Sequence, residues 1–329
     1  MDHYLIYHNE IPAFLYECTE TPIMKRLKHI GMNCGCEYTA FPRFADIAPY
    51  SRYDHSVGVA LIVWHFTHDC KQAIAGLLHD ANTPVFAHVI DFLHGDYLEQ
   101  ESTEAGTEML IAGSAELQAV LKKYELTTED VCDYHRYPIA DNDPPLLSAD
   151  RLEYTIGNSI NYGICTAEDA QRFYSDLTIG TNEDRNEELM FKNAPAAEAF
   201  AEAALACSRI YVSDEDRYAM QMLSEVLSYA MEHRIIREDD LHATEPEVIG
   251  KLLSDVRTAS LWNDFRCRRQ ITSAPQPLAA GCWRKIAAKK RFIDPMVRGK
   301  GRVSALSPAF AESLSSFLNN DHDYWVCGY

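Results

Sequence analysis

The 329-residue chain lacks the patterns that would place it at a membrane or outside the cell. No stretch approaches the roughly 20 consecutive apolar residues that a membrane-spanning helix requires. The opening residues, MDHYLIYHNEIPAFLY, carry acidic and polar side chains where a secretory signal peptide has a basic segment. We therefore expect no membrane association and a cytoplasmic location.

Paired cysteines are also lacking, although the chain contains ten cysteines. None of them forms a CxxC pair, and only Cys34 and Cys36 lie close together in the sequence. The scatter predicts neither a zinc ribbon nor a disulfide framework. Free thiols are the expected state of the ten residues, which are Cys18, Cys34, Cys36, Cys70, Cys132, Cys165, Cys207, Cys267, Cys282 and Cys327.

Positive charge is scarce, with 30 Lys and Arg against 49 Asp and Glu and a net charge of -19. Such a field repels polyanions, so nucleic acid is not an expected partner of the whole chain. Residues 266–302 are a local exception, because their only acid is Asp294. The stretch is either a solvated face that balances acidic neighbours or a local anion site. Its basic residues are Arg266, Arg268, Arg269, Arg284, Lys285, Lys289, Lys290, Arg291, Arg298, Lys300 and Arg302.

Three common catalytic motifs have no match. There is no GxxxxGK[ST] phosphate loop and no GxGxxG after a strand. The nearest approach to a GxSxG nucleophile turn, GNSIN at residues 157–161, lacks the closing glycine.

What the sequence does contain is a series of helical patterns, which predict a mainly α, or all-α, fold. In the segment 51–70, His55, Val59, Ile62 and Phe66 recur at helical spacing. Ser148 is a suitable N-cap for a later helix. Helices are expected at residues 51–70, 71–79, 101–123, 148–164 and, as one or two helices, 196–234.

Strand signals are few. Short β-branched runs at residues 270–273 and 292–297 predict one small β-hairpin. We expect an N-terminal segment, residues 1–44, packed on a core of residues 45–175. A helical C-terminal region, residues 176–329, would follow and would contain the basic stretch.

Two histidines and two aspartates form a constellation with metal-binding chemistry. His79 and Asp80 are adjacent, directly before the Asn82-Thr83-Pro84 turn signal, and His55 and Asp150 begin other helices. Neighbouring helical residues point about 100° apart, so His79 and Asp80 reach one ion only where the helix ends. Imidazole and carboxylate ligands suit one divalent transition metal, Fe, Mn, Ni or Zn, with Mg as an alternative.

The segments around these residues carry a resemblance. RYDHSVGV at 52–59, GLLHD at 76–80 and DRLEY at 150–154 resemble the HD-domain metal-dependent phosphohydrolases, most closely the deoxynucleotide triphosphohydrolase branch. KRFIDPMV at 290–297 resembles a C-terminal segment of bacterial members. The resemblance implies an HD-domain helical core and a metal held by His55, His79, Asp80 and Asp150. It further implies that Arg52, Arg151 and Tyr154 bind the substrate, and we expect Thr83 to belong to the same substrate-binding set.

The chain departs from that branch at two positions. Thr83 stands where the triphosphohydrolases have a histidine, and Gln100-Glu101 replaces a catalytic His-Glu. Glutamine does not titrate and so donates no proton to a leaving group. We therefore expect His88, or else His94, to serve as the proton donor and Glu101 as a base or orienting group.

These features predict a metal-dependent phosphohydrolase that cleaves a phosphoester or phosphoanhydride, with a nucleotide as the expected substrate. The alternative is a catalytically degenerate HD-domain module that binds nucleotides or regulates a partner. A third hypothesis gives the basic stretch 266–302 a role in nucleic-acid or polyphosphate contact. The resemblance also favours a homo-oligomer.

Overall fold

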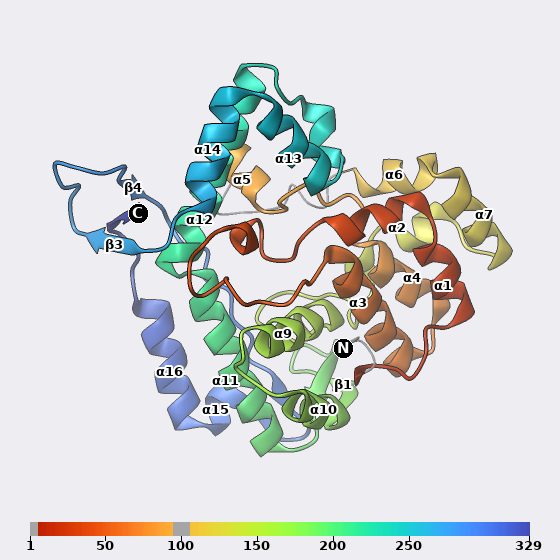
Figure 1. The fold of residues 1–329 in the computed structure, drawn as a ribbon. Helices are drawn as coiled ribbons and strands as arrows, with labels where there is room; N and C mark the ends of the chain where they lie inside the picture. The colour runs from red at the N-terminus through yellow and green to blue at the C-terminus, as the bar shows by residue number, and fades with distance from the viewer. Residues whose placement is uncertain (1–5, 95–105) are drawn as a thin grey trace.

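The computed structural model describes residues 6–94 and 106–329, and it is mainly helical (Figure 1). Its α-helices are α1 (Ala13–Thr19), α2 (Pro22–Arg26), α3 (Arg52–Thr67), α4 (Cys70–Leu78), α5 (Val89–His94), α6 (Thr107–Gly113), α7 (Ala115–Lys123), α8 (Thr128–Val131), α9 (Ala149–Asn161), α10 (Ala167–Ser175), α11 (Ala194–Tyr211), α12 (Asp214–Glu232), α13 (Glu245–Ser254), α14 (Val256–Arg266), α15 (Val303–Leu306) and α16 (Pro308–Asn319). Short 3₁₀ helices are η2 (Leu27–His29), η3 (Cys36–Tyr38), η4 (Tyr134–Arg136) and η5 (Glu238–His242).

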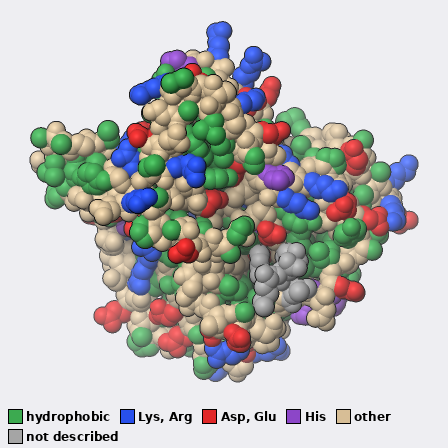
Figure 2. Space-filling view, viewed as in Figure 1, with side chains coloured by type: hydrophobic (Ala, Val, Ile, Leu, Met, Phe, Trp, Pro, Cys, Tyr) green, Lys and Arg blue, Asp and Glu red, His purple; other side chains and the backbone are tan. Residues whose placement is uncertain are grey.

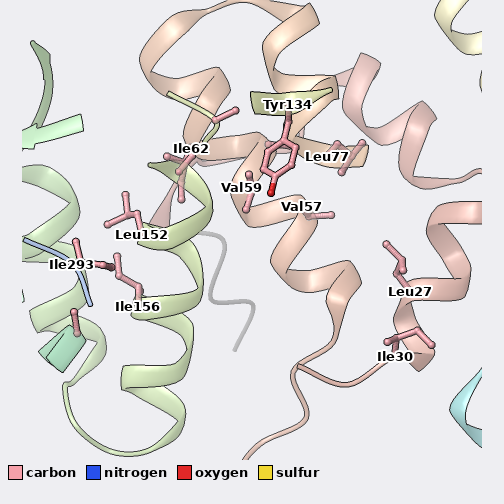
Figure 3. Close-up of a cluster of buried hydrophobic side chains, with 14 of the residues drawn as sticks. Leu27, Ile30, Val57, Val59, Ile62, Leu77, Tyr134, Leu152, Ile156 and Ile293 are labelled. Atoms are coloured by element: carbon pink, nitrogen blue, oxygen red, sulfur yellow. The ribbon is translucent and has the colours of Figure 1, made fainter. Parts of the chain in front are cut away.

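Helix α3 packs against both α4 and α9 at the centre of the molecule. All three correspond to expected helices, with their ends shifted by a few residues. Helix α3 is apolar on nearly all sides, as expected for a helix that is surrounded by other elements. Figure 3 shows the side chains that join these helices, including Ile62 of α3, Leu77 of α4 and Leu152 of α9, all fully buried.

The C-terminal region packs on this centre and shares its core. Helices α11 and α12 match the expectation of two helices at residues 196–234. Ile293, far along the chain, lies among the buried side chains that Figure 3 draws near Ile156 of α9. One hydrophobic cluster thus contains residues from both halves of the chain.

The expectation of a single helix at residues 101–123 is corrected in part. Residues 95–105 lie outside the described chain, and the remainder is divided into α6 and α7 at Ser114. Ser114 leaves the helical conformation and its hydroxyl accepts a hydrogen bond from the Leu117 amide, so it caps α7.

The expected β-hairpin is wrong, because its two runs belong to different sheets. The first run is β3 (Ile271–Ala274), whose partner β7 (Trp325–Gly328) also pairs with β4 (Arg284–Lys285). The second run contains β5 (Met296–Val297), which joins β1 (Leu177–Thr181), β2 (Glu187–Phe191) and β6 (Gly301–Arg302) in the order β1-β2-β5-β6. Pairing of β1 with β2 is antiparallel and that of β2 with β5 is parallel.

No described helix combines the length and the apolar character that crossing a lipid bilayer demands.

Candidate metal centre and active site

Local capping places the first histidine. Ser51 begins α3 as its N-cap, and its hydroxyl accepts a hydrogen bond from the Asp54 amide at 3.2 Å. The Asp54 carboxylate in turn accepts from the Ser51 amide at 3.0 Å, which completes a capping box. Arg52 and His55 therefore lie in the first turn of α3, with their side chains at one end of the helix.

The end of α4 places the adjacent His79 and Asp80. The last helical residue is Leu78, and the chain then turns, with the Ala81 amide bonded to the Leu78 carbonyl at 3.0 Å. This turn agrees with the Asn82-Thr83-Pro84 signal and lets two neighbouring side chains face the same point. Asp150 comes from the first turn of α9, for which Ser148 is the N-cap as predicted.

These four side chains meet. His55 Nε2 lies 3.2 Å from His79 Nε2 and 3.0 Å from Asp150 Oδ1. Asp80 Oδ2 lies 3.5 Å from His79 Nε2 and 3.9 Å from His55 Nε2. Ligand atoms about 2.1 Å from one ion are roughly 3.0 to 3.4 Å apart in octahedral or tetrahedral geometry, so the spacing suits a single cation.

The outer ring nitrogens fix the orientation of both imidazoles. His55 Nδ1 lies 2.5 Å from Glu153 Oε2, and His79 Nδ1 lies 2.7 Å from the Gly76 carbonyl oxygen. Since both partners only accept, each Nδ1 carries the proton and donates it. Both Nε2 atoms then face each other and two carboxylates, an arrangement that a positive charge between them stabilises, whether a proton on Nε2 or a metal ion that replaces it.

Electrostatics around the centre favour positive charge. Burial opposes ionisation of His55, yet hydrogen bonds with Asp150 and Glu153 outweigh it and raise its pKa to about 10. Burial likewise opposes ionisation of Asp150, but the hydrogen bond with His55 lowers its pKa to about 2. The charge of Arg52 likewise outweighs burial at Asp80 and lowers its pKa. The carboxylates of Asp80 and Asp150 are thus anionic at neutral pH and suit a divalent metal ion.

Asp80 is held by two further residues. Its Oδ2 accepts a hydrogen bond from Arg52 Nη1 at 2.9 Å, and its Oδ1 accepts from Thr83 Oγ1 at 2.6 Å. The expected role of Thr83 in substrate binding has no support in its position, because its side chain is fully buried and it does not line the cavity beside the centre. Thr83 instead orients Asp80, a candidate metal ligand, through this hydrogen bond.

The centre opens into a cavity of about 330 Å³. Arg52, Arg151 and Tyr154 line it, which brings three of the four expected substrate-binding residues to one place. The Arg151 guanidinium contacts Asp141 at 3.1 Å and the Leu146 carbonyl at 2.7 Å. Burial raises the pKa of Tyr154 to about 12, so its phenol stays protonated and can donate a hydrogen bond.

The expected proton donors differ in position. His88 lines the cavity, and its Nδ1 lies 2.9 Å from the fully buried Asp91 carboxylate. Burial lowers the pKa of His88, although the bond with Asp91 opposes this effect. His94 is the last residue of α5, but its side chain and the whole of Glu101 lie outside the described residues.

The basic stretch is divided between two roles. Several of its members balance acidic neighbours, as with Arg284 and Glu225 at 2.5 Å and Lys285 and Asp323 at 2.6 Å. Lys289 and Arg291 instead line the cavity, more than a hundred residues after the metal-binding motifs. On the face seen in Figure 2, Lys and Arg side chains are interspersed with acidic ones rather than gathered in one continuous patch.

Sequence reasoning missed Glu153, which orients His55, and Asp91, which orients His88. Glu153 follows Asp150 by three residues in a helix, a spacing that brings both side chains near the same neighbour. Asp91 follows His88 by the same interval. In both cases the available signal was an acidic residue three positions after a candidate site residue, which is Asp150 in one case and His88 in the other.

Comparisons with known proteins give two relatives and one solved structure that are similar to this chain. No family model matches the chain. The uncharacterized protein YdhJ of Bacillus subtilis is 28% identical over 204 residues, which are 61% of this chain and 61% of that protein, so the chain spans less than two thirds of this relative. The metal-dependent phosphohydrolase cns2 of Cordyceps militaris is 25% identical over 316 residues, 92% of this chain and 86% of that protein.

A solved structure shows the same fold. The crystal structure of a phosphohydrolase from Bacteroides thetaiotaomicron matches with a TM-score of 0.66, covering 97% of this chain and 96% of that one. Sequence identity is 16%, so this likeness concerns the fold.

Proposed function

We propose that the chain is an HD-domain metal-dependent phosphohydrolase, in line with its similarity to a metal-dependent phosphohydrolase and with its fold. We further propose that its substrate is a phosphoester or phosphoanhydride of a nucleotide. One observation carries the proposal. Four candidate ligand atoms and the guanidinium of Arg52 converge at the wall of a cavity that also contains Arg151 and Arg291. Metal-ligating and phosphate-binding groups are thereby placed together.

A divalent ion held by His55, His79, Asp80 and Asp150 would polarise a phosphoryl oxygen and lower the pKa of a bound water. The protein supplies the remaining positive charge. Arg52 Nε is buried without a hydrogen-bond partner in the described structure, which leaves a donor for a phosphate oxygen. Because Arg52 also bonds Asp80, it would fix the phosphate relative to the ligand set.

His88 is the proposed acid for the leaving group. Asp91 holds its Nδ1, so Nε2 is the ring nitrogen that exchanges a proton with substrate. A phosphate dianion in the cavity would raise the pKa of His88 and so favour the imidazolium that protonates a leaving oxygen. Glu101 and the side chain of His94 do not enter this assignment.

The proposed preference for a nucleotide comes from the walls of the cavity. Its volume of about 330 Å³ suits a small organic molecule. Aromatic side chains such as Tyr154, Tyr162 and Tyr211 lie on its surface, beside the cationic residues. Flat rings stack on such side chains, whereas a bare phosphate makes no use of them.

Phosphate release from a panel of nucleotides and simple phosphomonoesters tests the proposal. The protein is loaded in turn with Mn²⁺, Fe²⁺, Zn²⁺, Ni²⁺ or Mg²⁺. We expect turnover with at least one nucleotide, and a loss of about a hundredfold or more in His79→Ala. The exposed His233→Ala is the matched control. Equal activity of His79→Ala and the wild type would refute the proposal.

The alternative, a nucleotide-binding module without turnover, is favoured by one observation. Thr83 occupies the position of a family histidine and is buried against Asp80, so no titratable group faces the substrate from there. Under this alternative, the metal-loaded protein would bind nucleotides in calorimetry and release no phosphate from any of them.

A further inference from the structure

One face of α9 forms a continuous wall of the cavity. Asp150, Tyr154, Asn158 and Tyr162 follow one another at intervals of four residues, and all four line the cavity. A helix rises 1.5 Å per residue, so Asn158 lies about 12 Å along the axis from Asp150. The cavity therefore extends well beyond the metal centre, toward the C-terminal end of α9.

Cationic side chains lie beside the candidate ligands at the metal end. Arg52 contacts Asp80 directly, and Arg291 lies near enough to His88 to add to the effect of burial in lowering its pKa. Arg291 also acts on Tyr154, the second residue of the α9 wall. Phosphate groups of a substrate belong at this end.

The other end presents hydrogen-bond acceptors. Asn158 is 5% exposed, and its Nδ2 donates to the Tyr211 hydroxyl at 2.7 Å. Its Oδ1 is buried and has no hydrogen-bond partner in the described structure. An amide oxygen in this state loses hydration without compensation unless a ligand supplies a donor.

Asp216, in the first turn of α12, is placed toward the same end, because its charge acts on Tyr162, the last residue of the α9 wall. It is 9% exposed, lines the cavity, and receives only a long hydrogen bond from Cys36 Sγ, at 3.6 Å, among the described side chains. Its neighbour Arg217 does not neutralise it, because that guanidinium bonds Asp214 at 2.7 Å and the Val212 carbonyl at 3.2 Å. Burial raises the pKa of Asp216 to about 8, as expected for a carboxyl group without a charged partner.

We propose that Asn158 and Asp216 form a base-recognition site at this end, which binds the exocyclic amino group of a nucleobase stacked among the cavity tyrosines. The inference rests on the proposed function for the position of the phosphate. The Asn158 amide oxygen and the carbonyl oxygen of the Asp216 carboxyl group both accept hydrogen bonds, and an amino group offers two hydrogens to two such acceptors. Asn158 and Asp216 would thus determine which nucleotides bind.

Binding of nucleosides, which carry no phosphate, tests the site separately from hydrolysis. Ligand-observed NMR titrations detect weak binding and are made with adenosine, guanosine and cytidine. Each is compared with a nucleoside of the same ring that lacks the amino group: purine riboside, inosine and pyrimidin-2-one riboside. We expect at least one amino nucleoside to bind about tenfold more tightly than its counterpart.

Two variants then assign the effect to the proposed residues. Asn158→Ala and the isosteric Asp216→Asn should each remove most of the preference for the amino group, while the counterpart nucleoside binds as before. Asn319→Ala, on the exposed end of α16, is the control. Thermal unfolding of each variant establishes that the fold is retained, and Asp216→Asn serves if Asn158→Ala does not fold.

Three outcomes would overturn the inference: no nucleoside binds, the matched pairs bind equally, or both folded variants keep the wild-type preference. These outcomes are distinct from failure of the proposed function. A protein that prefers amino nucleosides but releases no phosphate would retain the base-recognition site and lose the hydrolytic assignment. Phosphate release without any preference for the amino group would retain the hydrolytic assignment and exclude the base-recognition site.

Discussion

At the scale of single residues, Glu153 is the side chain on which the orientation of His55 depends. Its Oε2 accepts from His55 Nδ1 at 2.5 Å and also from the Tyr50 hydroxyl, and Tyr7 lies 3.5 Å from its other oxygen. Glu153 is itself fully buried. The ring of His55 is therefore held from behind by a hydrogen-bonded carboxylate, an arrangement that raises the basicity of a metal-binding imidazole.

We expect Glu153→Gln to weaken metal binding by 10- to 100-fold, roughly the range found for partners of ligating histidines. The amide keeps the shape of the side chain but withdraws the negative charge that stabilises the Nδ1 proton. Metal titration by calorimetry measures the effect, with Glu17→Gln as the control. An unchanged dissociation constant would show that Glu153 serves packing alone.

Glu37 and Glu245 form a second group of carboxyls, in which Glu245 is buried and Glu37 is partly buried. Glu245 accepts from the Tyr38 hydroxyl at 2.7 Å and from the Gly31 amide at 2.9 Å. Glu37 Oε2 has no partner in the described structure. Burial, together with the charge of Glu245, raises the pKa of Glu37 from 4.5 to about 8.

This shift predicts a pH dependence of stability. Between pH 4.5 and about 8 the folded chain holds a proton on Glu37 that the unfolded chain has released, so the free energy of unfolding falls as the pH rises. Glu37→Gln needs no proton, and we expect it to be more stable than the wild type by about 1 to 3 kcal/mol at pH 9 but not at pH 5. Urea unfolding at both pH values measures this, with exposed Glu202→Gln as the control. The same difference at both pH values would contradict the assignment.

The four candidate metal ligands were predictable because each stands in a local motif whose residue types are uncommon next to apolar helices. Asn158 and Asp216 were not predictable. Neither stands in a motif, and their chemistry arises only because α9 and α12 both contribute side chains to the cavity. Arg291 was visible as part of a basic stretch, but its place at the cavity depends on the path of the chain in three dimensions.

At the scale of elements, the close approach of α3 and α9 depends on Gly58. A Cβ atom at this position would lie 2.6 Å from Oε1 of Glu153, well inside van der Waals contact. Gly58 follows His55 by three residues, so α3 carries no side chain at the point where the Glu153 carboxylate of α9 approaches the His55 imidazole. Steric exclusion of a side chain thus explains the glycine in the HSVGV segment.

We expect Gly58→Ala to destabilise the protein by about 1 to 3 kcal/mol and to weaken metal binding, because the methyl group displaces Glu153. Gly113→Ala is the matched control, since a Cβ atom there meets nothing within 4 Å. Its effect should be within about 1 kcal/mol, and favourable if anything. Thermal unfolding and metal titration are compared for the two variants. If they behave alike, Gly58 has no special steric role.

Helices were more predictable than strands for a physical reason. A helix such as α9 makes its hydrogen bonds within itself, so its cap and apolar spacing can be read in one stretch of sequence. The two-residue strands β4 and β5 pair with β7 and β2, which are distant in the chain. The run at residues 270–273 has strand propensity, but nothing in its sequence indicates that it pairs with β7.

At the scale of the whole molecule, metal binding and folding should be linked. The four ligands come from α3, the end of α4 and α9, which pack together in the centre. An ion that binds only the folded chain adds about 2.7 kcal/mol of stability at a hundred times its dissociation constant. For a chain of this size, we expect chelation to lower the Tm by several degrees.

Differential scanning calorimetry before and after dialysis against a chelator, and again after addition of metal, measures this linkage. His79→Ala should show little response to the metal. Identical Tm values in all three states of the wild type would contradict a metal centre joined to the core.

The path of the chain also bears on how the protein is made. The four candidate ligands belong to the first half of the sequence, yet Lys289 and Arg291 line the same cavity from near the C-terminus. During synthesis the ligands therefore leave the ribosome long before the wall opposite them exists. A competent pocket forms only when translation is nearly finished, so a nascent or prematurely terminated chain could take up metal without being able to enclose its substrate.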